Sequence, residues 1–150
     1  MADDYERYEK QCEEIRQENE KLLEEFADSL AAKGLTEATI NRHCENMDFY
    51  LNHFLLYDDA ERAESGVRRA GMFLGYWFIR KAMWASRSSI KSNAASLKKF
   101  YSFMVAKGKV RQEDLDDLKT QIKEEMPDWL ATLARYDDPD IDDPARVWRF

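Results

Sequence analysis

Lysine and serine side chains recur through the stretch RSSIKSNAASLKKFYSFMVAKGKVR, residues 87–111, and both side-chain types can donate hydrogen bonds to anions. This stretch lies in a longer window, Ser65 to Arg111, which holds eleven of the chain's 23 lysines and arginines and none of its 30 aspartates and glutamates. The window therefore carries a formal charge of +11 in a chain whose net charge is −7. Such a distribution favours a phosphate-binding surface, because carboxylates there would repel phosphate groups.

Two other interpretations of this basic window stay open. The window is compatible with a solvated face that happens to lack acids, and with a surface that binds an acidic protein partner or the chain's own acidic ends. In a chain that is one-fifth acidic, 47 consecutive positions without an acid are rare under random placement. Nucleic acid is therefore the favoured partner.

The sequence contains no complete motif for binding a metal ion or a nucleotide cofactor. His43, Cys44 and His53 are too irregularly spaced for a zinc site, and no phosphate-binding loop or dinucleotide fingerprint is present. Segment 137–143 is rich in aspartate, but it lacks the glycine and the terminal glutamate of a calcium-binding EF-hand loop. We therefore expect no metal, no cofactor, no small-molecule substrate and no disulfide framework, with Cys12 and Cys44 reduced.

The composition predicts an all-α fold. With 44% hydrophobic residues, five glycines and three prolines in 150 residues, it favours helices over sheets and a packed core over disorder. The expected helices are 3–33 (ending at Gly34), the helix that follows Thr36, 66–85, and 89–107 (capped by Ser86 and Ser88 and stopped by Gly108). A short amphipathic helix carrying Leu115, Leu118 and Ile122 should follow, then a helix that starts after Pro127 and an acidic tail.

Hydrophobic spacing assigns the buried faces of these helices. On the second helix the apolar face holds Ile40, Cys44, Met47, Leu51, Phe54 and Leu55. The third, expected to be the most buried, carries Phe73, Leu74, Trp77, Phe78 and Trp84. The fourth buries Ile90, Ala94, Leu97, Phe100, Tyr101 and Met104. Its opposite arc carries Lys91, Ser92, Ala95, Ser96, Lys98, Lys99 and Ser102. This outward arc of cations and small residues suits a surface that lies against phosphates.

The first helix carries a heptad pattern. Apolar and polar-aromatic residues recur at alternating spacings of three and four, at Tyr5, Tyr8, Cys12, Ile15, Asn19, Leu22 and Phe26. An asparagine at such a seam can fix the register of a parallel pair of helices, so a homodimer through this helix is one expectation. The other is a long helix that simply packs on its own bundle.

The ordered combination of these elements resembles the N-terminal core-binding domain of tyrosine recombinases, the phage integrase family. The matching stretches are FADSLAAKGLTEATINRHCENMDFYLNHF and SSIKSNAASLKKFYSFMVAKGKVR. They hold a helix ending in Lys-Gly-Leu, a second helix that begins at a threonine, and a late helix with Leu97, Phe100 and Tyr101 before a glycine. The resemblance covers about residues 22–122.

This resemblance implies a compact bundle of four to five helices in crossed hairpins, called SAM-like, which grips one side of a DNA duplex. In the family the second and fourth helices face DNA, so the implied DNA-binding residues are Thr39, Arg42, Arg87, Lys91, Lys98 and Lys99. The second helix departs from a purely basic face because it also carries Glu45 and Asp48. Three domains are predicted. Residues 1–21 form an N-terminal helical extension that is a candidate coiled coil, residues 22–125 form a SAM-like core-binding domain, and residues 126–150 form a short helix with an acidic tail.

Catalytic residues are not expected in this chain. The family cleaves DNA with a tyrosine supported by arginines, a lysine and a His-x-x-Arg motif in a separate C-terminal domain, and neither His43 nor His53 begins such a motif. The expectation is a cytoplasmic, non-enzymatic DNA-binding module of DNA integration or recombination, without a membrane span. The alternative is a protein-interaction module that uses the coiled-coil helix and the basic face to bind an acidic partner.

Overall fold

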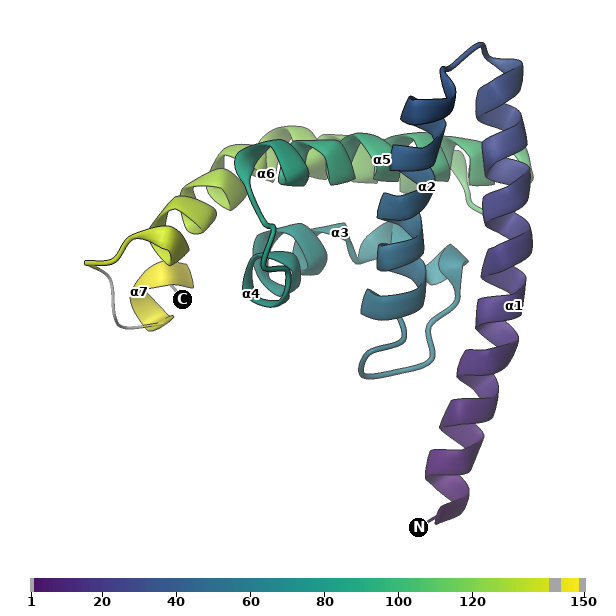
Figure 1. Ribbon diagram of the computed structural model, residues 1–150, viewed down its shortest axis with the longest axis horizontal. Helices are drawn as coiled ribbons and strands as arrows, with labels where there is room; N and C mark the ends of the chain where they lie inside the picture. Colours follow the sequence, from purple (N-terminus) through teal and green to yellow (C-terminus); the bar gives the residue numbers. More distant parts are fainter. Residues whose placement is uncertain (1, 141–143, 149–150) are drawn as a thin grey trace.

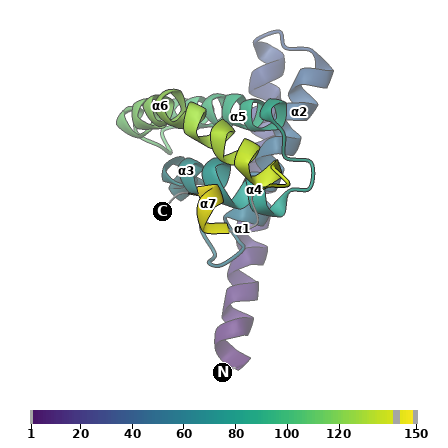
Figure 2. The same cartoon turned by 90° about the vertical axis from the view of Figure 1, so that its left-hand side faces the viewer.

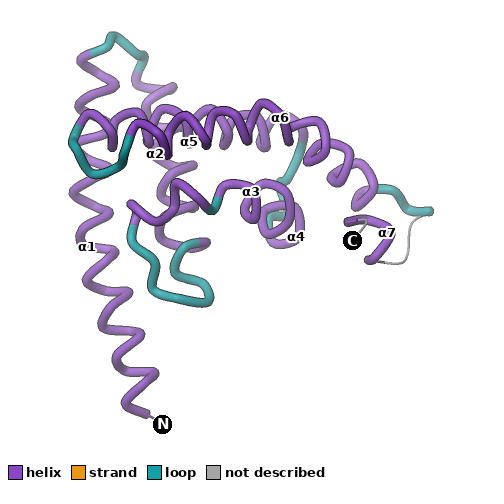
Figure 3. The backbone as a smooth tube through the Cα atoms, turned by 180° about the vertical axis from the view of Figure 1, so that it is seen from behind, coloured by secondary structure: helices purple, strands orange, loops and turns teal. Residues whose placement is uncertain are grey.

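The computed structural model describes residues 2–140 and 144–148, and this part of the chain folds as an all-α bundle (Figure 1). Two antiparallel hairpins make its frame. The first consists of α1 (Ala2–Ala32) and α2 (Glu37–Phe49), and the second of α5 (Arg87–Ala106) and α6 (Gln112–Asp137). The second hairpin runs across the first in Figure 1, and its two helices lie side by side in Figure 3. The predicted all-α fold of crossed helical hairpins is therefore confirmed.

Local sequence signals place both hairpin turns. Gly34 and Gly108 end α1 and α5 with φ angles of 84° and 74°, a backbone conformation that glycine adopts without a side-chain clash. Thr36 caps α2, and its side chain accepts a hydrogen bond from the Thr39 amide. α2 then continues into a π-helical turn, η1 (Tyr50–Phe54), which keeps the chain helical to Phe54.

The third predicted helix is shorter than expected and begins differently. A 3-10 segment, η2 (Ala63–Arg68), precedes a rod made of α3 (Ala70–Met72), the π-turn η3 (Phe73–Trp77) and α4 (Phe78–Lys81). The rod ends because Ala82 adopts extended angles, φ −90° and ψ 114°. The prediction of a helix over 66–85 with a buried Trp84 is thus wrong. Trp84 lies in the connector before α5 and is 59% exposed.

Pro127 does not divide the C-terminal region into two helices, as the sequence predicted. α6 runs without a break from Gln112 to Asp137 and curves along its length (Figures 1 and 3). A proline inside a helix costs about 3 kcal/mol because it removes a hydrogen bond and crowds the preceding turn. Burial on both sides of Pro127 opposes that cost. The buried residues of α6 are Leu115, Leu118, Ile122, Trp129, Leu130, Thr132 and Leu133.

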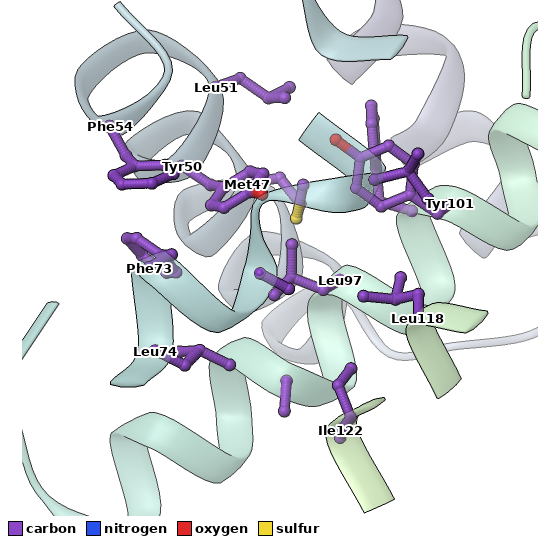
Figure 4. Close-up of a cluster of buried hydrophobic side chains, with 14 of the residues drawn as sticks. Met47, Tyr50, Leu51, Phe54, Phe73, Leu74, Leu97, Tyr101, Leu118 and Ile122 are labelled. Carbon is purple, nitrogen blue, oxygen red and sulfur yellow. The ribbon is translucent and has the colours of Figure 1, made fainter. Parts of the chain in front are cut away.

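The core lies where the two hairpins and the 70–81 rod meet (Figure 4). The predicted buried stripe of α5 is confirmed, since every member is at most 2% exposed. Two buried tyrosines tie the irregular η2 segment to this core. Tyr50 donates a hydrogen bond to the Gly66 carbonyl over 2.5 Å, and Tyr101 donates one to the Ala63 carbonyl over 2.7 Å. The Gly66 carbonyl also accepts a hydrogen bond from the Arg69 amide over 3.1 Å, so the Tyr50 bond adds a second, tertiary partner to it.

The heptad seam of α1 packs on its own chain. Cys12 and Ile15 are buried against Leu56, and the Tyr8 hydroxyl donates a hydrogen bond to the Leu56 carbonyl. Asn19, the predicted register residue, donates instead to Asn52 Oδ1 over 2.8 Å. The predicted pairing of two chains through this seam therefore gains no support. Both predicted domain boundaries, after residues 21 and 125, fall inside continuous helices.

The C-terminal segment folds back onto the bundle as α7 (Pro144–Trp148), which Figure 2 shows below the end of α6. Trp148 Nε1 donates to the Gly75 carbonyl over 2.9 Å, and Arg135 Nε donates to the Val147 carbonyl over 2.7 Å. α7 is thus anchored to the bundle. The aspartates at 142 and 143, which belong to the predicted acidic tail, lie outside the described residues.

Residues 2–140 and 144–148 carry neither a membrane-spanning helix nor a metal-binding cluster. No helix there has the length and apolarity that a bilayer crossing requires. Those residues also contain no group of three or more histidine, cysteine or acidic side chains placed to hold a metal ion. Cys12 and Cys44 are free thiols.

Candidate nucleic-acid interface

The outer face of α5 presents the cations that the sequence singled out. Because the apolar stripe of α5 is turned into the core, the opposite arc must face outward, and Arg87, Lys91, Lys98 and Lys99 are all exposed. Arg87, Lys91 and Lys98 follow one line along the helix at spacings of four and seven residues. The helix begins with Ser86 and Ser89 capping each other's backbone amides, and its first turn carries no acidic residue. The positive end of the helix dipole is therefore not offset by a nearby carboxylate.

A polar seam fixes α2 against α5. His43 Nδ1 lies 2.7 Å from Ser96 Oγ, and Asn46 Nδ2 donates to both Ser92 Oγ and Ser96 Oγ over 3.0 Å. The sequence placed Ser96 on the outward arc, and this placement is wrong, because Ser96 is fully buried. Packing of α2 on that flank of α5 covers Ser96, and its hydroxyl fills its hydrogen-bonding capacity with His43, Asn46 and the Ser92 carbonyl.

This seam positions the predicted DNA-binding residues of α2. Thr39 and Arg42 lie one turn before His43 and Asn46 on the same side of the helix, so they lie on the flank of α2 nearest α5. Arg42 is exposed and Thr39 is half-buried. Burial lowers the pKa of His43, and the positive charges of Lys99 and Arg42 lower it further. Cations from two helices are thus close enough to act on one buried imidazole.

A hollow of about 380 Å³ opens beside Lys98 and Lys99. The end of α1 lines one side of the hollow and α5 lines the other, and α6 contributes one residue. Its lining residues are Ser29, Leu30, Lys33, Ala95, Lys98, Lys99, Ser102, Phe103 and Lys119. Four lysines from three parts of the chain therefore line one hollow that has no carboxylate in its wall. Such a site attracts an anion with several negatively charged oxygens.

Four other cations of the basic window pair with carboxylates of the chain. Arg68 and Arg111 each lie 3.4 Å from Asp114, Arg69 lies 3.3 Å from Glu61, and Lys107 pairs with Glu25. All of these carboxylates lie outside the window in sequence. In the described part of the chain, no ion pair is formed by Lys33, Arg42, Arg87, Lys91, Lys98, Lys99 or Lys119. These seven cations of α2, α5 and the hollow are therefore left without a carboxylate partner among the described residues.

Asp48 of α2 lies apart from this surface. Asp48 lines a separate hollow of about 540 Å³ between α1 and α2, together with Glu20 and Glu24. Asn52 Nδ2 also donates to Asp48 Oδ1 over 2.6 Å. Asp48 therefore faces α1, whereas His43 and Asn46 face α5. Of the two acids noted on the polar side of the second helix, Glu45 and Asp48, the structure therefore places Asp48 away from the α5 surface.

Sequence reasoning missed Lys33 and Lys119. Both lie outside the acid-free window, in stretches rich in acids, and they are 86 positions apart. Only the crossing of the two hairpins brings them to the same hollow as Lys98 and Lys99. No local signal in the sequence could have joined them.

Comparisons with protein-family models, curated proteins and solved structures found no match for this chain.

Proposed function

We propose that this chain binds double-stranded DNA through the exposed face of α5, with contributions from α2 and from the four-lysine hollow. The observation that carries the proposal is the hollow itself, where Lys33, Lys98, Lys99 and Lys119 converge without a carboxylate. Like charges held close together repel one another, and a polyanion relieves that repulsion while releasing its own counterions.

The shape of the surface supports a duplex over a small anion. α5 has 20 residues and is therefore about 30 Å long, at 1.5 Å per residue. Its cations extend beyond the hollow through Lys91 to Arg87, a length of about 16 Å, over which a DNA duplex rises by roughly five base steps along its axis. A single small anion would leave this line of cations unused.

The resemblance to the core-binding domain of tyrosine recombinases supplies the orientation in this proposal, with α2 and α5 turned toward the duplex. The module we propose binds DNA without cleaving it, since neither histidine begins the His-x-x-Arg motif on which strand cleavage in that family depends. Strand cleavage would then come from a separate domain or chain.

The test compares the salt dependence of duplex binding for wild type and for a Lys91→Ala/Lys98→Ala/Lys99→Ala variant. If the three lysines each make one phosphate contact, the slope of log affinity against log salt should fall by about 2.7, at about 0.9 per contact. A control variant with the same charge change, Lys10→Ala/Lys21→Ala/Lys123→Ala, should keep the wild-type slope. An unchanged slope in the first variant would exclude α5 as the DNA face.

An acidic protein partner is the competing function, because it would use the same cations. Binding is therefore measured to duplex DNA, to single-stranded DNA and to poly-glutamate of equal charge. The proposal expects the duplex to bind most tightly, since only a duplex presents phosphates with fixed spacing along α5. Preferential binding of poly-glutamate would favour the protein-interaction module instead.

A further inference from the structure

An apolar tip adjoins the basic face at the connector between α4 and α5. Met83 is 99% exposed and Trp84 is 59% exposed, although both side chains are large and apolar. Single exposed apolar residues are common on protein surfaces, but two in succession at the apex of a short connector are less so. This tip, Met83 with Trp84, immediately precedes the helix that carries the proposed DNA contacts.

The tip is held in place by the surrounding structure. Ala82 on one side is buried, and its amide donates to the Phe78 carbonyl over 2.9 Å. The Ala85 amide on the other side donates to the Ala82 carbonyl over 3.1 Å, which closes a tight turn around the tip. The ring of Trp84 packs edge to face on Phe49, with centroids 5.3 Å apart. One part of the indole is therefore fixed while more than half of its surface stays open.

The charged residues next to the tip in the sequence are positive. Arg80 and Lys81 precede it and Arg87 follows it, and the nearest acids in sequence are more than 15 residues away on either side. Arg80 donates to the Tyr76 hydroxyl over 2.6 Å and Lys81 to the Tyr57 hydroxyl over 3.2 Å, so both are positioned without losing their charge to a carboxylate. A partner suited to this patch combines negative charge with flat apolar groups, as nucleic acid does where its bases are accessible.

We propose that Met83 and Trp84 form a wedge that contacts unstacked bases of DNA bound along α5. This inference rests on the proposed function. It predicts that the chain prefers a duplex containing a gap or a flexible step over a continuous duplex. The physical basis is that an apolar side chain entering between bases gains stacking and dispersion contacts, and that the cost of unstacking is smallest where the stack is already interrupted.

The experiment measures binding of fluorescently labelled 20-base-pair duplexes, either continuous or with a central two-nucleotide gap. Wild type should bind the gapped duplex more tightly. Trp84→Leu should weaken gapped-duplex binding by about fivefold or more, which is the lower end of the effect of removing one stacking side chain, and Met83→Ser should also weaken it through loss of apolar contacts. Both should leave binding of the continuous duplex nearly unchanged, since the lysines remain.

Two variants separate an effect on DNA binding from an effect on folding. Met83 makes almost no contact with the fold, so Met83→Ser should keep the wild-type thermal midpoint even if Trp84→Leu lowers it. Met72→Ser removes another exposed methionine, 51% exposed and outside the connector, and should bind like wild type. A 2-aminopurine base beside the gap gives a second readout. Binding of wild type should change the fluorescence of this base through stacking of Trp84, and binding of Trp84→Leu should leave that fluorescence unchanged.

Each outcome decides the inference. Equal affinity of wild type for gapped and continuous duplexes, with no effect of Met83→Ser, overturns the wedge and leaves DNA binding intact. Absence of any DNA binding by wild type overturns the proposed function and the wedge together. Tip-dependent binding to vesicles of anionic lipid, with no preference for the gapped duplex, would assign the tip to a membrane surface and also overturn the wedge.

Discussion

Lys33 and Lys119 provide the sharpest test of the hollow as a single site, because nothing in their sequence neighbourhoods marks them as DNA-binding. Replacing both with glutamine removes two positive charges from the wall of the hollow and leaves every lysine of α5 in place. Both side chains are exposed and form none of the ion pairs found in the described part of the chain. The free energy of unfolding should therefore change by less than about 0.5 kcal/mol.

The expected magnitude follows from the number of phosphate contacts. Two lost contacts lower the slope of log affinity against log salt by about 1.8. The affinity ratio between wild type and Lys33→Gln/Lys119→Gln should then shrink about twelvefold as salt rises from about 50 to 200 mM, since four raised to the power 1.8 is about 12. Fluorescence anisotropy titrations of a labelled duplex at four salt concentrations measure both slopes.

A matched control separates local contact from net charge. Lys10→Gln/Lys21→Gln makes the same charge change on α1 outside the hollow, and it should keep the wild-type slope. The reasoning is refuted if Lys33→Gln/Lys119→Gln also keeps the wild-type slope while replacement of Lys98 and Lys99 lowers it. DNA would then touch α5 alone, and the convergence of four lysines would have no role in binding.

Three further outcomes test the packing that holds this surface. Burial holds the pKa of His43 below its ordinary value of 6.5, so protonation of His43 favours the unfolded chain. The contribution of His43 to the free energy of unfolding should be constant above pH 6.5 and fall as the pH drops below 6.5. Urea unfolding between pH 7.5 and 5.5 measures this fall, which His43→Gln should lack. Gly66→Ala should cost about 1–3 kcal/mol in the same assay, because its Cβ would lie 2.3 Å from the Tyr101 hydroxyl; wild-type stability would show that the segment relaxes freely. Trp148→Ala should lower the thermal midpoint by removing the hydrogen bond to Gly75 and the ring contacts with Tyr76 and Tyr136; a wild-type midpoint would show that α7 adds no stability.

Local signals in the sequence were sufficient for most of the helices. Gly34, Gly108, Thr36 and Ser86 end or cap helices through conformations and hydrogen bonds that involve neighbours within a few residues. The buried stripe of α5 follows from the 3.6-residue period of the helix, which turns every apolar member to one side. The exclusion of acids from residues 65–111 is a property of the sequence alone, and it identified the exposed cations of α5.

Tertiary packing decided the features that depend on distant residues. Pro127 predicted a helix boundary, but burial of Trp129 and Leu130 on the far side keeps α6 continuous. Trp84 has a core-like side chain, yet the extended backbone of Ala82 places it outside the rod and leaves it exposed.

The same holds for the candidate site. Ser96 belongs to a polar arc by its spacing, and only the approach of α2 buries it against His43. Lys33 and Lys119 join Lys98 and Lys99 because two hairpins cross, and the spacing of residues along a chain carries no information on which of its helices cross. The sequence by itself thus determined that one helix would carry an uncompensated positive face, and the tertiary structure decided which other cations surround it.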